Sequence, residues 1–112
     1  MKITIEELES YLSRLYSGRV TDQSLFMKLI EEIGEVAEIL NKLAGRKQAD
    51  SDDLKDQLGT ELADVIHYVV AIAAVNHLDI NKIILDKDKK ASVKYHHDTN
   101  MEQFVLEQRS AK

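Results

Sequence analysis

No proline occurs among the 112 residues of this chain, and only four residues are glycine. Proline breaks helices and glycine weakens them, so their scarcity favours long helices over a turn-rich β fold. Hydrophobic residues make up 44% of the chain, which is enough for a modest core. The sequence therefore predicts an all-α protein with a single domain over residues 1–112.

Apolar residues recur at helical spacing in segments that begin with capping residues. Thr4 is the expected N-cap of a first helix, which Gly18 can end. Thr21 or Asp22 can cap the second helix. The helices expected after the first span about 22–44, 51–76, 81–94 and 100–109.

The boundaries of the later helices are predicted from local signals. Gly45 is the expected C′ residue of the second helix and begins a polar turn, and Ser51 opens the third helix. Asp79 is the expected N-cap of the fourth helix. Thr99 and Glu102 have the spacing of a capping box, which would begin a short final helix.

Two acidic pairs lie on the two long helices, Glu32 with Glu35 and Glu61 with Asp64. At about 100° of rotation per residue, the first acid of each pair lies about 20° outside the apolar stripe of its helix and the second about 80° outside it. Both pairs lie on the same side of their stripes. A short turn makes the helices antiparallel, which places equal offsets on one common flank. Glu35 and Glu61 also lie about 15 Å from the turn along their helices. The four carboxylates are therefore predicted to converge.

Converging carboxylates without a cation would repel one another and raise their pKa values. A set of oxygen ligands suits Mg²⁺ or Mn²⁺ rather than zinc or copper. The chain has no cysteine, which excludes disulfides and thiolate metal sites. We therefore expect Glu32, Glu35, Glu61 and Asp64 to bind Mg²⁺, or Mn²⁺ in its place.

Charge and hydropathy narrow the choice of partners. The net charge of −5 argues against nucleic-acid binding, although a metal can bridge carboxylates to the phosphates of a nucleotide. The N-terminus does not have the pattern of a signal peptide, and the apolar run from 65 to 75 is too short to span a bilayer. We expect a cytoplasmic protein with no membrane partner.

Histidines raise a rival interpretation of the metal site. His67 follows Asp64 by three residues, as in the Glu-x-x-His motifs of di-iron bundles. The motif occurs only once, and His67 lies about 60° further round the helix, so an ordinary polar or interface histidine is favoured. His96 and His97 beside Asp98 could bind a transition metal but are interpreted as tail residues.

The EEIGE string that ends at Glu35, followed by ELAD at 61–64, resembles the signature EExxE…ExxD of the MazG-like all-α nucleotide pyrophosphohydrolases. The segment KLIEEIGEVAEIL at 28–40 looks much like the first motif helix of that family. The resemblance covers roughly residues 20–95. The compact chain is most similar to the small single-domain subtype known from integron gene cassettes.

The resemblance implies hydrolysis of nucleoside triphosphates to monophosphate and pyrophosphate in nucleotide-pool house-cleaning. Glu32, Glu35, Glu61 and Asp64 would hold Mg²⁺, and Glu31 or Glu35 would orient or deprotonate the attacking water. Phosphate-binding candidates form a basic group near the end of the fourth helix, together with one residue of the second. They are Lys28, Lys87, Lys89, Lys90, Lys94 and Tyr95.

This chain departs from the family pattern beside Lys94 and Tyr95. Ala91 replaces an asparagine that relatives often have, and His96 replaces a proline. The base pocket is the least defined part of the site. Tyr16 is a candidate for stacking on the base, with ordinary core packing as the alternative, and Tyr11 is no better placed.

Assembly follows from the amount of apolar surface. The predicted hairpin carries more apolar residues than a small domain can bury, so two hairpins are expected to pair into a four-helix bundle, in a homodimer or homotetramer. Relatives are dimers or dimers of dimers. Two alternatives to the leading function are a phosphoribosyl-ATP pyrophosphohydrolase and a non-catalytic helical oligomerisation or regulatory module.

Overall fold

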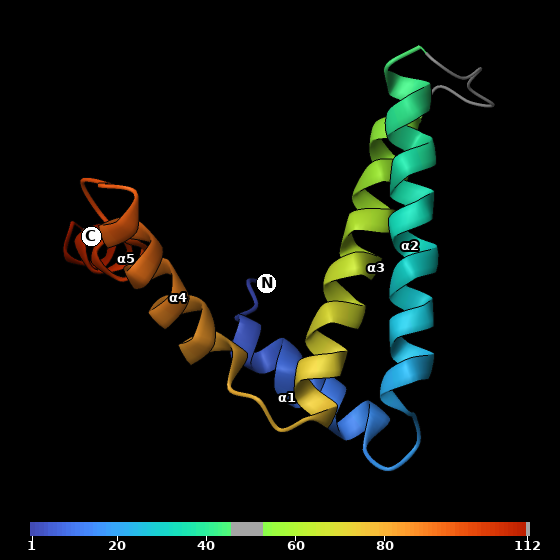
Figure 1. Cartoon of the computed structure of the whole chain (residues 1–112), viewed down its shortest axis with the longest axis horizontal. Helices are drawn as coiled ribbons and strands as arrows, with labels where there is room; N and C mark the ends of the chain where they lie inside the picture. Colours follow the sequence, from blue (N-terminus) through green and yellow to red (C-terminus); the bar gives the residue numbers. More distant parts are fainter. Residues whose placement is uncertain (46–52, 112) are drawn as a thin grey trace. The chain divides into compact units, whose positions relative to one another are not determined.

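The computed structural model describes residues 1–45 and 53–111. These residues form five α-helices and no strand, which confirms the all-α prediction (Figure 1). The helices are α1 (Ile5–Tyr16), α2 (Asp22–Leu43), α3 (Leu54–Val75), α4 (Ile80–Lys94) and α5 (Met101–Ser110). The chain divides into two compact units, Met1–Leu78 and Asp79–Lys112, and each is described by itself.

Reciprocal capping boxes begin the first two helices. The Thr4 hydroxyl accepts a hydrogen bond from the Glu7 amide (3.1 Å), and the Glu7 carboxylate accepts one from the Thr4 amide (2.8 Å). Thr21 and Ser24 repeat this arrangement at the start of α2. Thr4 is therefore the N-cap that the sequence predicts, and Thr21 rather than Asp22 caps α2.

The predicted end of the second helix is met within one residue, whereas the third helix begins later than the predicted residue 51. Ala44 is the C-cap of α2, and Gly45 follows with a φ of +75°, as expected of a C′ glycine. The rest of the predicted turn and the predicted start at Ser51 lie outside the described residues. Helix α3 begins at Leu54 after Asp53.

In the second unit, Asp79 caps α4 as predicted by accepting the Lys82 amide (3.1 Å). The predicted capping box of α5 is wrong. Asn100 is the N-cap and accepts the Gln103 amide (2.9 Å), because a short amide side chain in extended backbone is an equally good cap. The carboxylate of Glu102 instead pairs with Lys89 of α4 (2.9 Å).

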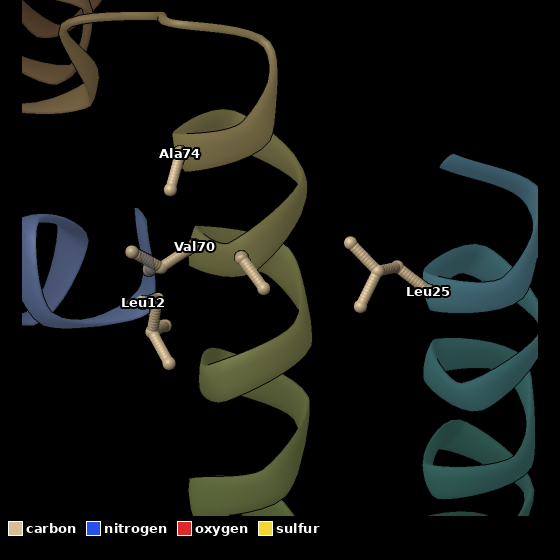
Figure 2. Close-up of a cluster of buried hydrophobic side chains, with 5 residues drawn as sticks. Leu12, Leu25, Val70 and Ala74 are labelled. Carbon is tan, nitrogen blue, oxygen red and sulfur yellow. The ribbon is translucent and has the colours of Figure 1, made fainter. Parts of the chain in front are cut away.

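The main core cluster of the first unit joins α1, α2 and α3. Leu12 is completely buried and lies against α3, where Val70 and Ala74 face it (Figure 2). Leu25 of α2 points toward α3 from the other side (Figure 2). Ala71 and Ala74 of α3 belong to this cluster, and their small side chains let neighbouring helices approach closely.

Helices α2 and α3 lie side by side and antiparallel, as predicted (Figure 1). Their contact does not cover the whole predicted apolar stripe. Part of that stripe remains exposed and forms a surface that we call the apolar flank. Its residues are Phe26, Ile30, Ile33 and Leu40 of α2 and Leu62, Ile66 and Val69 of α3, each at least 42% exposed.

The apolar flank and the acidic pairs occupy opposite sides of the hairpin. We take Leu25 of α2 and Leu54 of α3 as the reference position, at 0°, of each helix. Residues of the apolar flank lie about 60–140° from it, whereas the acids lie about 20–80° on the other side of it. Helix α3 is also long and apolar enough, by length and composition, to cross a membrane, although the core helix of a soluble protein can pass the same test. Only 22% of its most apolar window is buried.

Two histidines occupy left-handed backbone just after a helix, His77 after α3 and His96 after α4, each with a φ of 57°. A side chain is unfavourable there, and glycine is preferred. We expect His96→Gly to stabilise the folded protein by up to about 1 kcal/mol, measured by denaturant unfolding followed through helical circular dichroism. His97→Gly is the matched control and should destabilise, because the backbone of His97 is not left-handed. Equal effects of the two substitutions would contradict this account.

Candidate metal centre and active site

Three carboxylates meet between the two long helices, Glu32 from α2 and Glu61 and Asp64 from α3. One oxygen of each lies within 4.8 Å of the others, and all three side chains are half-buried. We call this group the carboxylate trio. Its members lie on the flank and at the height that the antiparallel offsets predict, so that part of the predicted convergence is observed.

Glu35, the fourth predicted ligand, lies outside the trio. It is one turn further along α2 than Glu32 and about 60° further round the helix, and its side chain is exposed. It lines a cavity of about 490 Å³ that also reaches Glu61 of the trio. The described residues that line this cavity are Glu35, Glu38, Ile39, Lys42, Asp53, Asp56, Gln57, Thr60 and Glu61.

The electrostatics of the trio fit a bound cation. Oxygen Oε2 of Glu61 is buried and has no hydrogen-bond partner, although a buried acceptor is normally paired. The pKa of Glu32 is raised to about 7, first because the adjacent Glu61 carboxyl can share its proton, and then by burial and the charges of Glu61 and Asp64. A hard cation would satisfy the unpaired oxygen and offset the repulsion, and oxygen ligands are those Mg²⁺ prefers.

Residues 20–97 match the family described as the MazG nucleotide pyrophosphohydrolase domain. The chain belongs to this family. Family membership implies pyrophosphohydrolase activity on a nucleotide, so the predicted enzyme class is confirmed. The match includes both long helices, and with them the whole carboxylate trio. No curated protein matches the sequence of the chain.

His67 does not join the trio of this MazG domain. Its Nε2 lies 2.7 Å from the Tyr16 hydroxyl of α1, and its ring packs edge-on against Tyr16 and Tyr68. This pairing favours the interpretation of His67 as an ordinary polar residue between helices. Tyr16 is half-buried beside the main core cluster, and burial is the first cause that raises the pKa of its hydroxyl, followed by Tyr68 and Tyr11. Tyr16 therefore packs as a core residue.

The phosphate-binding candidates fall into two groups. Lys28 of α2 is exposed and pairs with Glu31 at 3.3 Å. Lys89 pairs with Glu102 inside the second unit. The other candidates also lie in the second unit and are exposed, so their contacts with a substrate stay predictions. They are Lys87, Lys90, Lys94 and Tyr95.

The cavity beside the trio contains residues that the sequence analysis did not select. Lys42, Gln57 and Thr60 lie about 60–120° from the reference position of their helix, on the same side as the acids. This shared offset is the signal that could have identified them. They were missed because they belong to no recognised sequence motif. The cavity that they line forms only when the two helices pack side by side.

The raised pKa of Glu32 predicts how metal-free stability depends on pH. Between the ordinary value of 4.5 and the folded value of about 7, the folded protein binds more protons than the unfolded chain. Stability in EDTA should therefore fall as pH rises through that interval, and Glu32→Gln should remove that part of the fall. Thermal melts of both proteins from pH 4.5 to 8 measure it. Parallel curves for the two proteins would refute the prediction.

Proposed function

We propose that this protein hydrolyses nucleoside or deoxynucleoside triphosphates to the monophosphate and pyrophosphate, with Mg²⁺, or Mn²⁺ in its place, as the cofactor. The observation that carries the proposal is the carboxylate trio, with its buried unpaired oxygen, inside a MazG domain. We further propose a cytoplasmic role in nucleotide-pool house-cleaning, as in the small subtype from integron cassettes.

The trio and Glu35 are the proposed metal ligands. Bound there, Mg²⁺ supplies charge neutralisation for the triphosphate and Lewis-acid polarisation of the reacting phosphoryl group. Glu32, Glu61 and Asp64 hold their oxygens within 4.8 Å of one another before any ligand arrives, so little rearrangement is needed. Glu35 is exposed, lines the cavity that reaches Glu61, and can complete the set.

Glu35 and Glu31 are the proposed groups that orient or deprotonate the attacking water. Glu35 lines the cavity that reaches Glu61, so a water held there would lie beside the trio. Glu31 directly precedes Glu32 on α2. It forms an ion pair with Lys28, which is exposed on the same helix. Lys28 is also a proposed phosphate ligand, together with Lys87, Lys90, Lys94 and Tyr95 of the second unit.

The activity is tested with a panel of triphosphates and phosphoribosyl-ATP, assayed for pyrophosphate rather than phosphate. We expect pyrophosphate release from at least one nucleoside triphosphate, dependent on Mg²⁺ or Mn²⁺ and abolished by EDTA. Cleavage of phosphoribosyl-ATP alone would transfer the proposal to that substrate. If no compound is cleaved and Mg²⁺ does not bind, the proposal fails.

The apolar flank supports assembly into a homodimer or homotetramer through paired hairpins. Apolar surface of this extent on two adjacent helices is best buried against the same surface of a second copy. We expect Ile66→Glu, at a position 52% exposed, to shift the protein to monomer in size-exclusion chromatography with light scattering. Thr60→Glu puts the same charge on the opposite flank of α3 and should leave the assembly unchanged. A wild-type monomer would contradict the prediction.

A further inference from the structure

No further inference is drawn: the strongest candidate, the apolar flank of α2 and α3 with the cavity of about 310 Å³ that Phe26 and Ile72 line beside it, belongs to the assembly surface already proposed, and nothing in the structure shows what else covers it.

Discussion

Asp64→Asn should lower kcat/KM for triphosphate hydrolysis by about 10²–10³-fold, the usual cost of removing one group that stabilises a transition state. The substitution removes one of the three charges that meet between the helices, and the metal loses a ligand. Titration with Mg²⁺ should show weaker binding in parallel. Steady-state kinetics and calorimetry measure the two effects.

The same substitution should leave metal-free stability unchanged or raise it, because it relieves repulsion within the trio. This distinguishes a ligand from a structural carboxylate, whose loss would lower stability. Asp98→Asn changes an exposed acid outside every helix and is the matched control. An Asp64→Asn protein that binds Mg²⁺ and turns over like wild type would exclude Asp64 from the site.

Leu12→Ala should destabilise the protein by about 3 kcal/mol, because it leaves a cavity at a completely buried position. For a chain of this size the melting temperature should fall by about 10–20 °C. Leu12 of α1 lies against α3, where Val70 and Ala74 face it, so the substitution removes atoms from the middle of the main core cluster (Figure 2). Thermal melts and urea unfolding measure the loss.

Leu15→Ala is the control for this prediction. Leu15 lies on the same helix and loses the same atoms, but its side chain is 37% exposed. Its substitution should cost less than half as much, since less apolar surface returns to water. Equal losses of stability at the two positions would contradict the special importance of Leu12 for the main core cluster.

The helices and most of their ends could be predicted from sequence because their causes are local. The absence of proline, the apolar spacing and the caps Thr4, Thr21 and Asp79 act within one turn of the chain. The cap of α5 was misjudged because Thr99 and Asn100 are adjacent and both can cap. Which of the two residues caps the helix depends on contacts that Glu102 makes with another helix. A local sequence pattern does not contain such contacts.

The trio could be predicted because an antiparallel hairpin converts helical spacing into proximity. Glu32, Glu61 and Asp64 follow that rule, whereas Glu35 has the same angular offset as Asp64 but is exposed and lies outside the trio. The cavity could not be predicted, because its shape comes from the gap between two helices. The excess of apolar residues on the hairpin was expected from the sequence, but which of them stay exposed could not be predicted, since periodicity does not say how many neighbours share a stripe.

The opposite placement of the acids and the apolar flank on one hairpin has an evolutionary consequence. The described residues that line the cavity and those of the apolar flank are two separate sets with no member in common. The proposed active site and the proposed assembly surface can therefore change separately under selection. In a lineage of such chains, substitutions on one side of the two helices could alter the proposed site while the proposed assembly surface on the other side stays the same.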